Sequence, residues 1–176
     1  MTLSTEHPNK SFEDSDQVLI QQQDFSLANE VALLEHNNET DGAVVTFTGR
    51  VRNQNNGNKV TGLTLEHYPG MTEKTILNII ALARKRWSIG KVKVIHRIGA
   101  LDIGEQIVFV GITSKHRQDA FAANEFIMDF LKVNAPFWKK ERYAADNNLN
   151  SKRRSQANEQ WLAAKSSDQN KAKTWE

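Results

Sequence analysis

Three lysines surround a proline in the segment Leu131–Glu141, which reads LKVNAPFWKKE. Pro136 must end the apolar helix before it, because proline lacks a backbone N–H and its ring clashes with the carbonyl four residues earlier. Lys132 therefore falls in the last turn of that helix, and Lys139 and Lys140 follow the break. A lysine that loses hydration becomes available as a neutral base or nucleophile, while a second lysine can stay charged and hold an anion.

Two aromatic residues, Phe137 and Trp138, stand between the proline and the second lysine. We expect them to exclude water from a catalytic pair formed by Lys132 and Lys139. Two functionless alternatives remain open for the same residues. A lysine in the last turn favours the negative end of the helix dipole by about 0.3–1 kcal/mol, and paired aromatics often fill a core.

Two further groups of cations predict anion binding. His116 and Arg117 open the final helix, where free N–H groups already favour a phosphate, and Ser114 is the expected N-cap. Arg50 and Arg52 lie two residues apart on a predicted strand, so they should point to the same face as a clamp. Pairs of this kind also occur as ordinary solvent-facing residues.

The length of the final helix limits how these groups can combine. Arg117 and Lys132 are 132 − 117 = 15 residues apart, which is about 22 Å along a helix. Groups at both ends cannot hold one small substrate within one chain. If they belong to one site, a second subunit must supply one set, and a symmetric homodimer is the simplest arrangement.

The composition describes an ordinary globular protein without thiol chemistry. The 176 residues carry 39% hydrophobic and 25% charged residues, a net charge of +2 and no cysteine. Disulfides, thiolate nucleophiles and cysteine metal ligands are therefore excluded. His36, His67 and His96 lack metal-ligand spacing, so we expect structural roles for them, no metal and no cofactor. No apolar run approaches a membrane span or a signal peptide, which predicts a cytoplasmic protein.

The hydrophobic pattern predicts one α+β domain with a largely antiparallel sheet flanked by helices. No glycine-rich loop follows a strand, which argues against a nucleotide-binding fold. The expected order is a flexible polar leader (1–24), a helix from Ser26 to His36, a hairpin of strands 42–52 and 60–70, a helix (71–87), strands 91–99 and 105–114 around a turn (100–104), a helix (116–134), a flexible insert (144–160) and a closing segment (161–176).

Five segments, in this order, resemble the catalytic subunit family of molybdopterin synthase: DGAVVTFTGRVRN, LTLEHYPGMTEK, VIHRIG, SKHR and LKVNAPFWKKE. The likeness spans roughly Asp24–Arg142. It implies an α/β hammerhead-type catalytic domain over 25–143. It also implies a sulfurtransferase of molybdenum cofactor biosynthesis, which converts cyclic pyranopterin monophosphate to the dithiolene of molybdopterin. The sulfur would come from the thiocarboxylated C-terminal glycine of a small ubiquitin-like subunit, in a heterotetramer built on a homodimer.

The same resemblance implies a set of site residues. The family's essential lysines correspond to Lys132 and Lys139. Its substrate-contacting positions fall on Arg50, Val51, Arg52, His116, Arg117, Lys132, Lys139, Lys140 and Glu141, with Phe47 and Lys165 as weaker candidates. Lys165 follows Trp161 where the family usually has an arginine, and lysine keeps the charge but loses the planar fork.

Two other functions remain possible from the sequence. One is a scaffold that binds a ubiquitin-like tail without turnover. The other is a nucleic-acid-binding module, since residues 139–176 carry nine Lys or Arg against five Asp or Glu. The low net charge of the whole chain and the lack of a nucleic-acid motif argue against the second.

Overall fold

Helices separate groups of strands along the part of the chain that the computed structural model describes, residues 16–55, 57–143, 159–162 and 166–175. The α+β class with mostly antiparallel strand pairing is confirmed. The elements are β1 (Asp16–Gln21), α1 (Leu27–Glu35), β2 (Ala43–Arg50), β3 (Gln54–Asn55), β4 (Asn58–His67), α2 (Met71–Arg86), β5 (Val92–Arg97), β6 (Gly99–Asp102), β7 (Gln106–Ser114), α3 (Arg117–Asn134), β8 (Phe137–Tyr143), β9 (Glu159–Leu162) and α5 (Ser166–Lys173).

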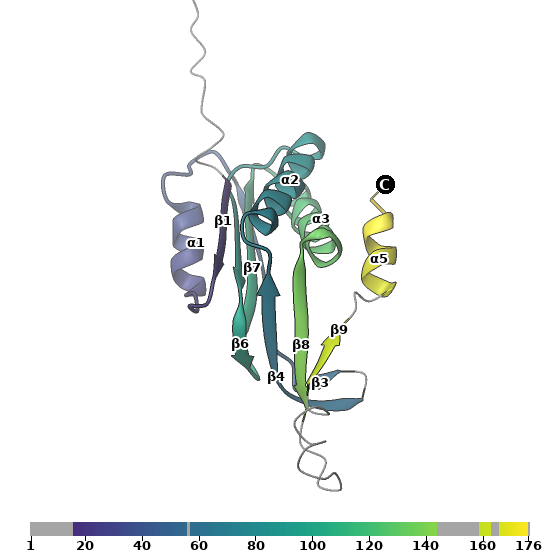
Figure 1. Ribbon diagram of the computed structural model, residues 1–176. Coiled ribbons are helices and arrows are strands. Elements are labelled where there is room, and N and C mark those ends of the chain that lie inside the picture. Colours follow the sequence, from purple (N-terminus) through teal and green to yellow (C-terminus); the bar gives the residue numbers. More distant parts are fainter. Residues whose placement is uncertain (1–15, 56, 144–158, 163–165, 176) are drawn as a thin grey trace, which may run out of the picture.

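The first sheet has the strand order β1-β5-β7-β2 and is covered on both faces. α1 packs on one face, and α2 and α3 pack on the other (Figure 1). β5 and β7 are central, so side chains on both faces of each strand are buried. β7 accordingly contains a continuous apolar run, whereas β5 also buries Lys93, His96 and Arg97. Alternate residues serve the two cores: Ile95 and Phe109 face α1, whereas Val94 and Val110 face α2 and α3.

The second sheet has the order β3-β4-β8-β9. β6 also pairs with β4, on the edge of β4 that faces away from β8. Its long strand β8 begins directly after the α3 helix (Figure 1). α3 ends at Asn134, and Ala135 adopts extended backbone angles (φ −72°, ψ 128°). The predicted helix break at Pro136 is confirmed, and it places the segment after the proline on a strand.

The predicted hairpin between 42–52 and 60–70 was wrong. β2 pairs with β7 in the first sheet, whereas β4 pairs with β8 in the second. The ladder between β2 and β7 shifts register at Gly49 and Arg50, and the chain then passes from one sheet to the other. The predicted turn 100–104 was also partly wrong, because Gly99–Asp102 forms β6 against β4.

The ends of the chain contain more regular structure than the sequence indicated. Residues 16–21 belong to β1, parallel to β5, and not to a flexible leader. Glu159 and Gln160, expected in the flexible insert, begin β9 against β8. The remainder of the predicted leader (1–15) and of the predicted insert (144–158) lies outside the described residues.

The two predicted helix caps had different outcomes. Ser26 is the N-cap of α1, and its hydroxyl accepts a hydrogen bond from the amide of Asn29. Ser114 is not the cap of α3. It ends β7, its hydroxyl donates to the carbonyl of Ser88, and His116 takes the N-cap position.

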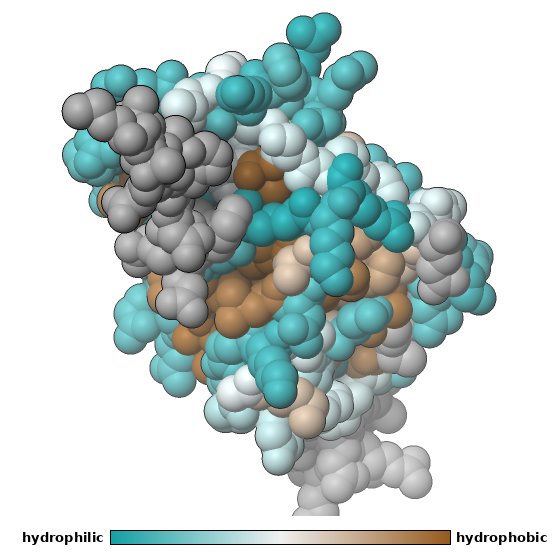
Figure 2. Space-filling model, turned by 90° about the horizontal axis from the view of Figure 1, so that it is seen from above, coloured by the Kyte–Doolittle hydropathy of each residue, from teal (hydrophilic) through white to brown (hydrophobic). Residues whose placement is uncertain are grey.

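The C-terminal helix α5 packs against α3 through an aromatic contact. The indole N–H of Trp175 donates to Asp129 Oδ2 at 2.8 Å. The indole ring also meets Trp87 and Phe126 edge-on, each at 5.7 Å. Viewed from the α2 and α3 end, apolar residues form a band between polar margins (Figure 2). No helix in the described ranges is long and apolar enough to cross a membrane.

Candidate active site

A cavity of about 640 Å³ opens where the end of α3, the start of β8 and the end of β2 meet. This volume suits a small-molecule ligand. It brings together seven of the residues that the sequence singled out: Phe47, Arg50, Val51, Arg52, Lys132, Lys139 and Glu141. A second hollow, of about 620 Å³, adjoins it and shares four lining residues, Val51, Arg52, Gln54 and Asn55.

Lys132 and Lys139 enter the cavity from different elements. Lys132 stands in the last turn of α3, its side chain is 40% exposed, and its Nζ lies 3.8 Å from Asp168 Oδ1. Lys139 lies on β8 opposite Leu65 of β4, and its side chain is half-buried. The break at Pro136 is therefore what allows a helix lysine and a strand lysine to line one cavity.

The alternation of side chains along β8 decides which residues reach the cavity. Phe137, Lys139 and Glu141 line it, as every second residue of a strand must share a face. Trp138 and Lys140 are not among the lining residues. Trp138 is 48% exposed, so the expectation that it excludes water from the lysine pair is not met, and of these two aromatic residues only Phe137 lines the cavity.

Lys140 is engaged on the opposite face of the second sheet. Its ammonium group forms an ion pair with Glu159 of β9 and lies 5.6 Å from the ring centre of Trp161. The predicted contact of Lys140 with substrate therefore finds no support in the cavity of this chain.

The two strand arginines reach the same cavity, but a regular strand does not place them there. β2 ends at Arg50, and Val51 and Arg52 follow in the passage between sheets. Both arginines are exposed, and the Nε of Arg50 donates to the carbonyl of Gly104 at 2.7 Å. Val51 is buried and anchors the segment in the small core beneath the second sheet.

Glu141 is a buried carboxylate with neutral donors around it. The amide nitrogen of Asn55 lies 3.0 and 3.1 Å from its two oxygens, and the Tyr143 hydroxyl donates to it at 2.7 Å. That hydrogen bond raises the pKa of Tyr143 to about 12, so the phenol stays a donor. These bonds fix the carboxylate of Glu141 in the lining of the cavity.

His96 lines the cavity, although its spacing in the sequence predicted a structural role only. Its ring stacks on Phe137 with 3.7 Å between centroids and 16° between planes. Nδ1 lies 2.8 Å from the carbonyl of Arg97, so Nδ1 carries the proton of the neutral ring and Nε2 the lone pair. Burial, with a smaller contribution from the positive charge of Lys139, lowers the pKa of His96 to about 3.

The charges around the cavity favour an anionic ligand. Four lining residues are cationic (Arg50, Arg52, Lys132 and Lys139) and two are anionic (Glu141 and Asp168), which gives 4 − 2 = +2. Asp168 comes from α5 and was not anticipated from the sequence. The sequence contained one indication of Asp168, which is its position three residues after the candidate Lys165.

The remaining predicted residues lie elsewhere. His116 and Arg117 are exposed at the far end of α3, and neither lines the cavity. The helix between Arg117 and Lys132 runs without interruption, so the separation of about 22 Å expected from helix geometry holds. Lys165 lies outside the described residues.

Comparison with known proteins gives a consistent result. The family model described as MoaE protein matches residues 20–134, more than half of the chain. The molybdopterin synthase catalytic subunit of Escherichia coli K12 is 51% identical over 158 residues, covering 90% of this chain and 97% of the relative.

Solved structures agree with the sequence relatives. A molybdopterin biosynthesis MoaE protein from Burkholderia ambifaria has a TM-score of 0.72 and 41% identity, covering 91% of this chain and 97% of its own. A molybdopterin synthase from Staphylococcus aureus has a TM-score of 0.70 and 30% identity, covering 82% of this chain and 96% of its own.

Proposed function

The chain belongs to the MoaE family of molybdopterin synthase catalytic subunits, and we propose that the cavity between α3, β8 and β2 is where it transfers sulfur. The observation that carries this proposal is the convergence of Lys132 and Lys139 with Arg50 and Arg52 on one cavity of net positive charge. The substrate would be cyclic pyranopterin monophosphate. The sulfur donor would be the thiocarboxylated C-terminus of a small ubiquitin-like subunit.

The reaction places two demands on this cavity. In each transfer a new carbon–sulfur bond forms on the pterin as an oxygen substituent leaves the same carbon. The carbon–sulfur bond of the thiocarboxylate breaks, and water supplies the oxygen that restores a carboxylate. Both the donor tail and the phosphate are anionic, which the lysines and arginines match. The chain itself has no cysteine, so the sulfur must arrive on the partner.

We assign the transfer chemistry to the two lysines. Lys132 acts as a base or transient nucleophile, and Lys139 stabilises the negative charge that develops on the thiocarboxyl group or the pterin. Arg50 and Arg52 hold the phosphate. Phe137 and the neutral ring of His96 wall the cavity beside Lys139 and limit its access to water.

The test mixes the purified chain with thiocarboxylated small subunit and cyclic pyranopterin monophosphate and measures the dithiolene product. Lys132→Ala and Lys132→Arg should both lose activity, because arginine keeps the charge but does not release a proton near neutral pH. Lys139→Arg should retain part of the activity that Lys139→Ala loses. Full activity in Lys132→Arg would remove Lys132 from the role of base or nucleophile.

We further propose that a second copy of the chain completes the phosphate site with its own His116 and Arg117. The support is that these two residues lie at the opposite end of α3 from Lys132, so they are too far from the cavity of their own chain to contact its ligand. Mixing inactive Lys132→Ala and Arg117→Ala chains tests the idea. Random pairing should restore about a quarter of the wild-type sites if the site is shared, whereas no restoration would place each site within one chain.

The wider assembly follows from the same proposal. A homodimer of this chain with two small subunits would form a cytoplasmic heterotetramer. A scaffold without turnover, the first alternative, would bind the small subunit and leave the pterin unchanged. A nucleic-acid module, the second alternative, would show affinity for RNA or DNA that falls steeply with salt. Neither alternative accounts for the lysine pair inside a cavity.

A further inference from the structure

The arginine segment Arg50–Arg52 is held by a loop of the neighbouring strands, Ile103–Glu105, which joins β6 to β7. Three hydrogen bonds connect the two. The amide of Val51 donates to the carbonyl of Glu105 at 2.9 Å, and the amide of Gly104 donates to the carbonyl of Val51 at 2.9 Å. The third runs from Arg50 Nε to the carbonyl of Gly104 at 2.7 Å. The position of the segment therefore depends on the position of the loop.

The loop is in turn fixed by the side chain of Glu105. One carboxylate oxygen accepts a hydrogen bond from the amide of Asp102 at 2.6 Å, which closes the loop on itself. The other lies 3.4 Å from both terminal nitrogens of Arg97. Gly104 has φ +84°, a conformation that glycine adopts without strain.

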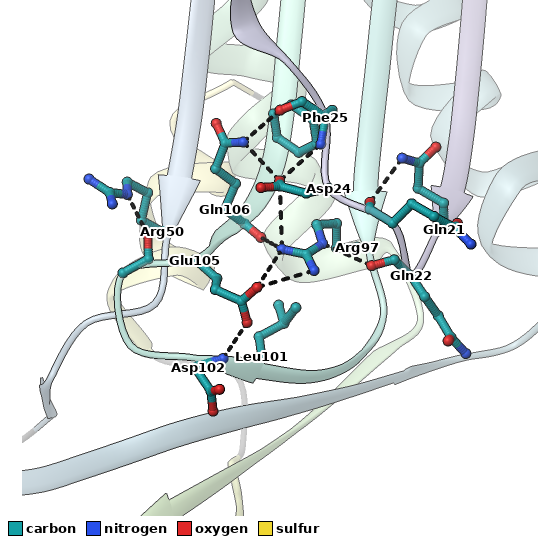
Figure 3. A network of polar contacts seen from close by, with 12 residues as sticks. Gln21, Gln22, Asp24, Phe25, Arg50, Arg97, Leu101, Asp102, Glu105 and Gln106 are labelled. Carbon is teal, nitrogen blue, oxygen red and sulfur yellow. Dashed lines mark hydrogen bonds and ion pairs between the residues drawn. The ribbon is translucent and has the colours of Figure 1, made fainter.

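Arg97 forms a rigid base for this arrangement. It is the last residue of β5, it is 7% exposed, and its guanidinium donates to the carbonyls of Gln22 and Gln106 at 3.0 and 3.1 Å. Asp24 lies 3.6 Å away as a second carboxylate. Figure 3 shows the guanidinium between these groups, with Glu105 pointing toward it and Arg50 on the other side of the loop.

We propose that Glu105 and Arg97 are positioning residues for the anion-binding arginines of the active site. Neither lines the cavity. Their ion pair holds the loop, and the loop fixes the backbone of Val51 and the guanidinium of Arg50. Without the carboxylate of Glu105, the loop loses its direct contact with Arg97 of β5. The arginines should then spend less time in the geometry that binds a phosphate. This inference rests on the proposed function for its effect on substrate.

The test compares Glu105→Ala and Glu105→Gln with Asp102→Asn. Asp102→Asn is a matched control, because it also removes a carboxylate from this region, but that carboxylate contacts Arg142 and its side chain is 81% exposed. With saturating thiocarboxylated small subunit, Glu105→Ala should raise KM for cyclic pyranopterin monophosphate about tenfold, the scale of one hydrogen bond to a charged group. Its kcat should stay close to wild type, and Asp102→Asn should leave KM unchanged.

A second readout does not require turnover. Amide hydrogen exchange at Val51 should accelerate in Glu105→Ala, while exchange at Val110 in the middle of β7 should not. Glu105→Gln keeps the size and the bond from Asp102, so it remains informative if Glu105→Ala fails to fold. Unchanged Val51 exchange overturns the inference, and so does a fall in kcat without a rise in KM. Absence of product from the wild-type chain would instead refute the proposed function. In that case hydrogen exchange at Val51 would still test whether Glu105 holds the loop.

Discussion

Substitution of His96 should remove a defined part of the pH dependence of stability. The pKa of this buried imidazole is lowered to about 3, against 6.5 for an accessible histidine. Above pH 6.5 both the folded and the unfolded chain hold it neutral, and its contribution is fully present. As the pH falls from 6.5 toward 3, the unfolded chain binds a proton that the folded chain excludes. The free energy of unfolding therefore falls by about 1.4 kcal/mol per pH unit, or about 3 kcal/mol at about pH 4.5.

His96→Asn tests this directly, because asparagine does not titrate and its amide can still donate to the carbonyl of Arg97. The variant loses the stack on Phe137, so it should be less stable than wild type near neutral pH. Urea unfolding at about pH 7.5 and about pH 4.5 should show the difference between the two proteins shrinking by about 3 kcal/mol. His36→Gln, which removes an exposed histidine, is the control. A difference that stays constant with pH would refute the assignment of a neutral buried His96.

Three further outcomes are expected. Trp175→Phe should lower the free energy of urea unfolding by about 1–3 kcal/mol, because buried Asp129 loses its indole donor; an unchanged midpoint would contradict this anchoring of α5. Gly111→Ala should also lower the free energy of unfolding by about 1–3 kcal/mol, since a Cβ there would meet Leu34 Cδ1 at 2.4 Å. A melting temperature equal to that of wild type would contradict this, because it would show that Leu34 and α1 move aside without loss of stability. Lys140→Ala should leave dithiolene formation nearly unchanged, and a loss as large as that of Lys139→Ala would show that the outer face of β8 reaches the substrate.

The helices were predictable because each carries a local signal. Periodic apolar residues predicted helices over 71–87 and 116–134, each within one residue of the observed Met71–Arg86 and Arg117–Asn134, and Pro136 fixed the end of the second. Strand partners carry no such signal, because pairing joins residues far apart in the chain. The sequence placed β2 beside β4 because a turn lies between them, whereas the structure pairs β2 with β7 across some sixty residues. β1 was missed for a related reason, since its polar flanks outweighed Val18–Ile20 until β5 supplied a partner.

The site shows the same division between local and distant information. The lysine pair and the strand arginines were identified from residue type and spacing, and the cavity contains all four. The face of the sheet on which Trp138 and Lys140 lie depends on the register of β8 against β4. No local sequence pattern predicts that register. The role of His96 depends on Phe137, forty-one residues later, stacking on it from the other sheet.

The two sheets explain why the cavity forms where it does. Phe137 begins β8 in the second sheet and stacks on His96 at the end of β5 in the first, so the two sheets meet directly beside Lys139. A protonated histidine in that position would add a cation to a cavity that already holds four and would repel Lys139. The neutral ring avoids this repulsion and still presents the Nε2 lone pair. Burial of His96 therefore serves the cavity as well as the core, because it joins the sheets without adding positive charge beside the lysine pair.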